Sequence, residues 1–238
     1  MVKQPVIGIL ETGRPPEDLA STHGNYPEMV RAWLDLPGAE FRSFAVLNGE
    51  IPQDPAAADL WLITGSKFGV YEGHDWIAPA EAFIRACRDA GVAMVGICFG
   101  HQLIAQALGG RVEKSGRGWG LGVHRYGPVN WPDALGQAPE TIAIQAYHQD
   151  QVIAPPEAAE TIAASDFCPY AALWYPGFAL TVQGHPEFDK PYVQDLLEAR
   201  RGTVLRDDQV DAAQASMAQD VTRGDLARIV RDHLLKSG

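Results

Sequence analysis

Cysteine is scarce in this sequence. The 238 residues include three cysteines, Cys87, Cys98 and Cys168, which are too few and too scattered to form the disulfide framework of a small secreted domain. Residues 1–5 lead straight into an apolar segment at 6–10 and do not show the pattern of a signal peptide. A reducing, cytoplasmic compartment is therefore the expected location.

Long apolar runs and basic residues are also lacking. No apolar run comes near the roughly 20 residues that a membrane-spanning helix needs. The 19 Lys and Arg residues are outnumbered by 30 Asp and Glu, which gives a formal net charge of −11 at pH 7. Because nucleic acids and anionic membranes attract basic surfaces, we expect neither nucleic acid nor membrane as a main partner.

The common motifs for cofactors and metals are missing as well. The sequence contains no P-loop motif, so a bound nucleotide is not expected. Metal-ligand spacing is absent around four of the histidines, His23, His74, His124 and His233. We therefore expect a protein that works without a cofactor and without a metal ion.

What is present is an alternation of apolar strands and amphipathic helices. The expected strands are 6–10, 41–47, 60–64 and 92–95, the expected helices are 26–36, 76–90 and 101–108, and residues 11–25 are expected to form a loop. Such alternation predicts the α/β class, with a mostly parallel open sheet and helices on both faces. In sheets of this kind functional residues gather beyond the carboxyl ends of the strands.

The pattern changes after residue 110. Short strands with Gly and Pro turns are expected at 111–112, 122–126, 141–144, 159–164, 171–175 and 179–182, followed by a helix at 192–201. The first three are expected to be antiparallel and to form a small β addition. One or two closing helices packed on the sheet are expected after residue 202. We predict a single domain at 1–238, with a core at about 6–200 and a C-terminal helical extension at about 202–238.

The segment from Gly96 to Gly100 has the residues of a nucleophile elbow. Cys98 lies between an expected strand and an expected helix, with a glycine two residues before it and another two residues after it. Glycines at these positions allow a sharp turn that lifts one side chain clear of the sheet. The unpaired N–H groups and the positive dipole end of the helix favour a thiolate there. The alternative is that Cys98 is a small buried hydrophobic residue, as most free cysteines are.

A second segment, Gln183–Glu187, follows the last expected strand. His185 and Glu187 are two residues apart, so in extended geometry their side chains leave the same face of the chain. Pro186 favours that geometry at the residue before it. Glu187 can then orient one imidazole nitrogen while the other faces Cys98, which is the arrangement that nucleophilic catalysis requires. Taken alone, the segment also fits a surface turn with an exposed glutamate.

Hydrolysis of an amide also requires donors for the oxyanion of the tetrahedral intermediate. The N–H of Phe99 follows the nucleophile directly and is one natural donor. Gly65 follows another expected strand and is the expected second donor, although a glycine at a strand end also serves simply to turn the chain.

Three segments together resemble the marker segments of class I (triad-type) glutamine amidotransferases. They are residues 96–102 (GICFGHQ), 147–152 (YHQDQV) and 183–188 (QGHPEF), and both their order and their spacing match. A fourth segment, 63–71 (ITGSKFGVY), resembles the stand-alone, GMP-synthase-like members. The resemblance spans roughly residues 6–200 and implies a flavodoxin-like open sheet of the kind found in that family.

The resemblance implies that Cys98 is the nucleophile, His185 the base and Glu187 its orienting carboxylate. Gln102 would help to hold glutamine, and the backbone near His148 and Gln149 would hold its α-amino and α-carboxylate groups. The substrate-binding residues are thus expected to be Ser66, Gln102, His148 and Gln149. The sequence departs from the family at two positions, with Gly184 where Phe is common and Tyr147 where Ser is usual.

Three functions remain open at this level. The first is a glutaminase that releases ammonia from glutamine through a γ-glutamyl thioester. The sequence contains no synthetase or nucleotide-binding domain, so an ammonia acceptor would be a separate chain. The second is a stand-alone hydrolase of γ-glutamyl peptides or amines that uses the same triad. The third is a non-catalytic regulatory or binding module, which the intact triad argues against.

Overall fold

The computed structural model describes residues 4–235, and their centre is a nine-stranded sheet with the order β2-β1-β3-β4-β11-β10-β9-β6-β7. One half of the sheet is parallel and contains β1 (Val6–Leu10), β2 (Glu40–Phe44), β3 (Leu60–Ile63), β4 (Ala93–Ile97) and β11 (Ala179–Val182). The other half is antiparallel and contains β6 (Gly120–Pro128), β7 (Ile142–His148), β9 (Glu160–Ala164) and β10 (Ala172–Tyr175). A separate pair joins β5 (Arg111–Lys114) to β8 (Asp150–Ala154).

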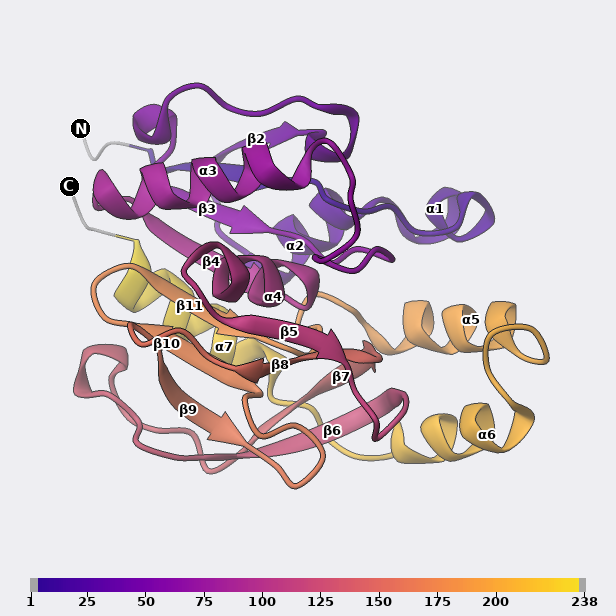
Figure 1. Cartoon of the computed structure of the whole chain (residues 1–238). Coiled ribbons are helices and arrows are strands. Elements are labelled where there is room, and N and C mark those ends of the chain that lie inside the picture. The colour runs from indigo at the N-terminus through magenta and orange to yellow at the C-terminus, as the bar shows by residue number, and fades with distance from the viewer. Residues whose placement is uncertain (1–3, 236–238) are drawn as a thin grey trace.

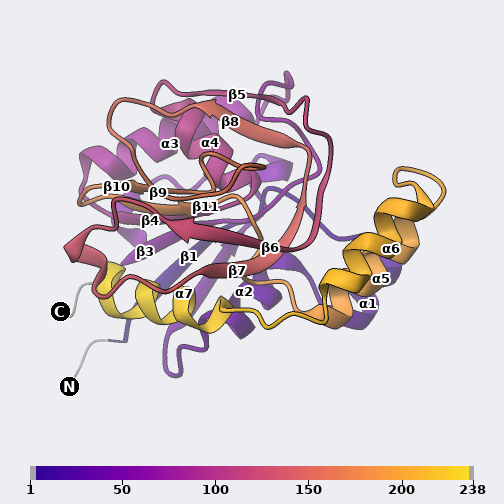
Figure 2. The same ribbon diagram turned by 90° about the horizontal axis from the view of Figure 1, so that it is seen from below.

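Helices cover both faces of the sheet. In Figure 2 the helices α3 (Ile77–Asp89) and α4 (Phe99–Ala107) lie above the sheet, and α2 (Tyr26–Leu34) and α7 (Arg223–Ile229) lie below it. Alternate strand residues face opposite layers, as the pleat requires. Leu60 and Leu62 pack in the core with α2 and α7, whereas Trp61 and Ile63 pack in the core with α3 and α4. The predicted α/β class with helices on both faces is confirmed.

A helical lobe stands at the carboxyl ends of the parallel strands. It contains α1 (Glu17–His23), α5 (Lys190–Arg200) and α6 (Asp207–Ser216), which Figures 1 and 2 both show side by side. α1 follows β1 and α5 follows β11, so both helices begin at the edge of the sheet where parallel strands end. This is the edge at which α/β proteins bind their ligands.

Several boundaries differ from the expected ones. The expected loop at 11–25 contains α1, a short helix with Glu17 and Asp18 in its first turn and Leu19 buried in the lobe. Its single buried apolar residue explains why no helical periodicity is visible in the sequence. The helix expected at 26–36 ends at Leu34, because Asp35 adopts a left-handed conformation with φ 41°. The strand expected at 41–47 ends at Phe44, and residues 46–48 form a 3₁₀ turn.

The C-terminal extension contributes to two parts of the fold. α7 packs on the sheet, as expected, and continues into a π-helical segment, Val230–Leu234. α6 instead packs in the lobe, where Val210 and Ala213 meet residues of α5. One strand, β8, had no counterpart among the expected elements, because the polar Asp150 and Gln151 at its start hide its periodicity.

Every helix in residues 4–235 falls short of the length and apolarity that crossing a bilayer requires.

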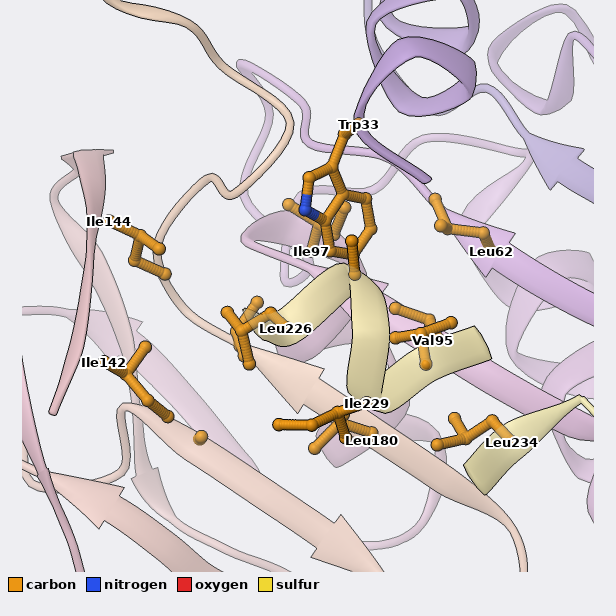
Figure 3. Close-up of a cluster of buried hydrophobic side chains, with 14 of the residues drawn as sticks. Trp33, Leu62, Val95, Ile97, Ile142, Ile144, Leu180, Leu226, Ile229 and Leu234 are labelled. Atoms are coloured by element: carbon orange, nitrogen blue, oxygen red, sulfur yellow. The ribbon is translucent and has the colours of Figure 1, made fainter. Parts of the chain in front are cut away.

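The core beneath the sheet shows how closely the extension is joined to the rest of the chain. Figure 3 shows Leu226 and Ile229 of α7 among Val95, Ile97 and Leu180 of the sheet. Leu226 is 2% exposed. Because one cluster joins both regions, we expect residues 4–235 to unfold as a single domain.

Leu226→Ala tests this expectation. Removing the buried side chain should lower the free energy of unfolding by about 2–5 kcal/mol while the transition stays single and cooperative. Urea titration followed by far-UV and near-UV circular dichroism measures both quantities. Val221→Ala is the matched control, because Val221 is 40% exposed just before α7 and should cost less than about 0.5 kcal/mol. A separate early transition in the Leu226 variant would instead make the extension an independent unit.

Candidate active site

Cys98 lies at the junction of β4 and α4 in a left-handed conformation. Its backbone has φ 51° and ψ −100°, a region that residues with a side chain seldom occupy. Its N–H donates to Val182 O at 2.9 Å, which ties the turn to β11. Cys98 is the N-cap residue of α4, so the unpaired N–H groups of the first helical turn lie beside its sulfur. The predicted elbow is therefore present.

Steric contacts explain why the two positions around Cys98 carry glycine. A Cβ on Gly96 would lie 2.7 Å from Gly100 O, and a Cβ on Gly100 would lie 2.5 Å from Ile63 O. Both distances are shorter than real Cβ contacts, so a side chain at either position would force β3, β4 and α4 apart. The glycines thus allow the helix to begin against the neighbouring strand, with Cys98 held between them.

His185 and Glu187 meet as the sequence predicted. His185 Nδ1 lies 2.8 Å from Glu187 Oε1, and the side chains are 4% and 0% exposed. The His185 ring stacks on Phe188 with a centroid separation of 4.0 Å and an interplanar angle of 5°. His185 N–H donates to Gln145 O at 2.7 Å, which fixes the backbone of the turn to β7. The imidazole is thereby held in place by a carboxylate, a ring and a strand.

Cys98 completes the group. Its side chain and the His185 ring border the same backbone position, Gly65, and both residues line one cleft. Burial alone would lower the pKa of His185, but the Glu187 carboxylate and the neighbouring Cys98 outweigh it and raise the pKa above its usual value. The raised pKa keeps His185 protonated beside Glu187 and Cys98, which is the state in which an imidazole can support a cysteine nucleophile.

The loop after β3 lies against this pair. A Cβ on Gly65 would lie 2.8 Å from His185 Cε1 and 3.8 Å from Cys98 Cβ, so only glycine fits between the loop and the imidazole. Thr12, which is fully buried after β1, anchors the loop. Its N–H donates to Thr64 Oγ1 at 3.0 Å, and its hydroxyl donates to Thr64 O at 2.9 Å. Gly65 is therefore held beside Cys98, and its role as an oxyanion donor with Phe99 remains a prediction.

A cleft of about 580 Å³ opens above Cys98 and His185. All four residues predicted to bind substrate line it: Ser66, Gln102, His148 and Gln149. Gln102 Nε2 donates to Asp150 O at 2.9 Å and to Gln183 Oε1 at 3.2 Å, so both of its N–H groups are used. Burial lowers the pKa of His148 to about 3, and a ring that stays neutral fits the expected role of shaping the cleft. Substrate binding by these residues remains a prediction.

Sequence reasoning missed three contributors to the site. Gln183 Nε2 lies 3.7 Å from Cys98 Sγ and donates to it, which connects Gln102 to the sulfur. The Tyr71 hydroxyl donates to Asp150 Oδ2 at 2.8 Å and so joins the loop after β3 to β8. Arg223 of α7 donates from Nε to Pro186 O at 2.7 Å and from Nη2 to Glu187 O at 3.0 Å. Gln183 and Tyr71 lie inside the marker segments, whereas no motif marks Arg223.

A family model described as "Glutamine amidotransferase class-I" matches residues 58–198, more than half of the chain. The chain belongs to the class-I glutamine amidotransferase family. Gamma-glutamyl peptidase 5 of Arabidopsis thaliana is 30% identical over 205 residues, which cover 82% of this chain and 81% of that protein. The glutamine-hydrolyzing GMP synthase of Thermus thermophilus is 41% identical over 102 residues, which cover 41% of this chain and 19% of the synthase.

Solved structures of glutamine amidotransferases share the fold of this family member. The protein from Methylobacillus flagellatus superposes with a TM-score of 0.77 at 18% identity, covering 100% of this chain and 97% of the other. The protein from Thermotoga maritima superposes with a TM-score of 0.72 at 17% identity, covering 98% and 100%. The stretch matched by the family model ends before Arg223. The side chain that donates to the carbonyls of Pro186 and Glu187 therefore lies outside the matched stretch.

The raised pKa of His185 leads to a first prediction for the site. Below this pKa the ring keeps its proton, and above it the ring can no longer protonate a leaving group, so activity should fall on the alkaline side. Cys98→Ser should lower the pKa of His185, because the charge of the sulfur is lost. Histidine NMR titration of both proteins measures the shift, with the exposed His233 as internal reference. An unchanged pKa in the variant would show that the sulfur does not act on the ring.

Arg223 leads to a second prediction. Arg223→Gln should reduce kcat by roughly tenfold and leave KM nearly unchanged, because the turn that holds His185 and Glu187 loses two charge-assisted hydrogen bonds. Arg223→Lys should recover part of the loss, since an ammonium can replace one of the two donors. Steady-state kinetics and the pH profile of kcat measure these effects.

Arg231→Gln is the matched control for that test. Arg231 Nη1 donates to Leu34 O at 2.6 Å from the same C-terminal segment, but it makes no contact with the His185 turn. Both variants should lose similar stability, and only the Arg223 variant should lose turnover. Equal losses of kcat in the Arg223 and Arg231 variants would show that Arg223 contributes only to stability.

Proposed function

We propose that this protein is a cysteine-dependent hydrolase of γ-glutamyl amide bonds. The observation that supports it best is the contact chain from Cys98 through His185 to Glu187, formed at a left-handed elbow beneath an open cleft. Cys98 is the proposed nucleophile, His185 the acid and base, and Glu187 the residue that orients the imidazole. An intact triad of this kind leaves little reason to assign a purely regulatory role.

The reaction consists of two balanced steps. The Cys98 thiolate attacks the γ-carbonyl carbon, the C–N bond breaks, and His185 gives its proton to the departing nitrogen. This leaves a γ-glutamyl thioester on Cys98. Water then attacks the thioester, His185 takes a proton from it, and the C–S bond breaks to release glutamate. Phe99 and Gly65 are the proposed oxyanion donors in both steps, and neither step needs a cofactor.

The cleft favours a substrate larger than glutamine. Its volume of about 580 Å³ lies within the range of roughly 300–1,000 Å³ that pockets for drug-sized ligands occupy. Glutamine alone is much smaller than such ligands. The Arabidopsis relative that matches over most of both chains is named a gamma-glutamyl peptidase. We therefore propose γ-glutamyl peptides or amines as the principal substrates.

Two further features support a self-sufficient enzyme in a reducing compartment. Thr12 already anchors the loop that carries Gly65, so the chain itself holds the proposed donor beside Cys98. The three cysteines are all free thiols, and a cytoplasmic location would keep Cys98 in the reduced form that catalysis requires.

A second candidate is a glutaminase subunit that supplies ammonia to a synthetase on another chain. The similarity to GMP synthase favours it, because the match reaches 41% identity over 102 residues. The two candidates share the chemistry and differ in the leaving group, which is ammonia in one case and an amine or amino acid in the other.

Direct assay separates the candidates. The purified protein is offered glutamine, a γ-glutamyl dipeptide and a γ-glutamyl amine, and the release of glutamate and ammonia is followed in parallel. Faster turnover of the γ-glutamyl compounds is the expected result. Brisk ammonia release from glutamine, with the other compounds uncleaved, would favour the subunit of a synthetase.

Substitutions in the triad test the mechanism in the same assay. Cys98→Ser should reduce kcat by on the order of 10³-fold or more, and Glu187→Gln should retain more activity because it removes only the orienting charge. Cys168→Ala is the matched control, since Cys168 is also a buried free thiol but lies outside the cleft. A fully active Cys98→Ser protein would remove Cys98 from the mechanism.

A further inference from the structure

The chemistry of the proposed function divides the cleft into two sides. His185 gives its proton to the departing nitrogen, so the leaving group must lie next to the imidazole. Gln102, Tyr71 and Asp150 are linked by hydrogen bonds on the side of α4 and β8. Gln102 and His148, two of the residues expected to hold the glutamyl part, both contact Asp150 O on that side. The opposite side, next to His185, is therefore the place for the leaving group.

The His185 side begins with an aromatic wall. Phe188 stacks on the imidazole, and Tyr26 lies 5.5 Å from Phe188 between ring centroids. Trp119 and Tyr147 form a second aromatic pair in the cleft, with ring centroids 5.4 Å apart and an interplanar angle of 52°. All four residues line the same cleft. An apolar or aromatic side chain on the leaving group would find matching surface here.

Arg200 stands at the end of this wall. It is the last residue of α5, it is half-buried, and it lines the same cleft as Tyr147. Burial raises the pKa of the Tyr147 phenol, and the nearby positive charge of Arg200 opposes that rise. Tyr147 occupies the position where the resemblance would place a serine.

Within residues 4–235 Arg200 also lacks an acidic partner in an ion pair, although the chain is rich in acidic residues. None of the ion pairs found in residues 4–235 involves Arg200. Its neighbour Arg201 pairs with Glu198 at 2.9 Å and with Asp211 at 2.9 Å. A half-buried cation without a counter-ion, facing a cleft, suits an anionic ligand, and guanidinium binds a carboxylate through two parallel hydrogen bonds.

We propose that Arg200 binds the free α-carboxylate of the leaving amino acid. This inference rests on the proposed γ-glutamyl hydrolase activity and narrows its substrate class. The preferred substrates are γ-glutamyl peptides with an unblocked carboxylate on the residue after the γ-glutamyl bond, and an apolar side chain there packs against Trp119 and Tyr147. γ-Glutamyl amines, blocked peptides and glutamine lack the carboxylate at that position and bind less well.

A pair of matched substrates tests the subsite. γ-Glutamylphenylalanine and its C-terminal amide differ only in the carboxylate, so Arg200 should act on one and not on the other. The native protein should cleave the acid with a kcat/KM roughly 10- to 100-fold above that of the amide, the range expected for a hydrogen bond to a charged group. Arg200→Gln should abolish the preference by reducing kcat/KM for the acid, mainly through KM, while the amide changes by less than about twofold.

Two further variants serve as controls. Arg200→Lys keeps the positive charge and should therefore restore part of the preference. The recovery should be incomplete, because an ammonium cannot form two parallel hydrogen bonds with a carboxylate. Arg201→Gln removes the adjacent guanidinium, which is engaged with Glu198 and Asp211, and should leave the preference intact. Thermal unfolding of each protein confirms that the variants are folded at the assay temperature.

Three outcomes would overturn the proposal that Arg200 binds this carboxylate. Equal cleavage of acid and amide by the native protein would show that no group recognises the carboxylate. Equal losses on both substrates in Arg200→Gln would place Arg200 on the glutamyl part that the substrates share. Failure to cleave either compound, together with ammonia release from glutamine, would overturn the proposed substrate class as well, and that result is distinguishable from the first two.

Discussion

The left-handed backbone of Cys98 is the conformation on which the rest of the site depends. With φ 51° the side chain leaves the sheet at the carboxyl end of β4, in front of the unpaired N–H groups of α4. The conformation is costly for a residue with a side chain, and it persists because β3, β4 and α4 approach one another closely through Gly96 and Gly100. The fold thus holds Cys98, the proposed nucleophile, in place before any substrate arrives.

Buried charge is the second constraint, and the C-terminal segment helps to satisfy it. Glu187 is fully buried, so its charge is tolerable only because His185 faces it at 2.8 Å. Arg223 holds the carbonyls of Pro186 and Glu187 from α7, and α7 in turn is packed into the core beneath the sheet. A helix distant in sequence therefore helps to fix the geometry of the proposed acid and base.

The wall of the cleft beyond His185 draws on other parts of the fold than the proposed triad. The proposed catalytic residues come from the ends of the parallel strands, whereas this wall comes from Tyr26 in α2, Tyr147 in β7 and Arg200 in α5. The proposed chemistry and the proposed selectivity thus reside on different parts of the structure. We expect substitutions in the wall to alter the accepted leaving group without disturbing the triad, which is built on the more deeply buried sheet.

Features that depend on neighbouring residues could be predicted from the sequence. Apolar strands before Gly65, Cys98 and His185 and the glycine spacing around Cys98 were enough to predict the elbow, the parallel sheet and the meeting of His185 with Glu187. The remaining features depend on contacts that form only in the folded chain. The roles proposed for Arg223 and Arg200 depend on residues far away in the chain, and α1 and β8 are too short or too polar to show a period. Packing, which no local pattern encodes, brings these residues to the site.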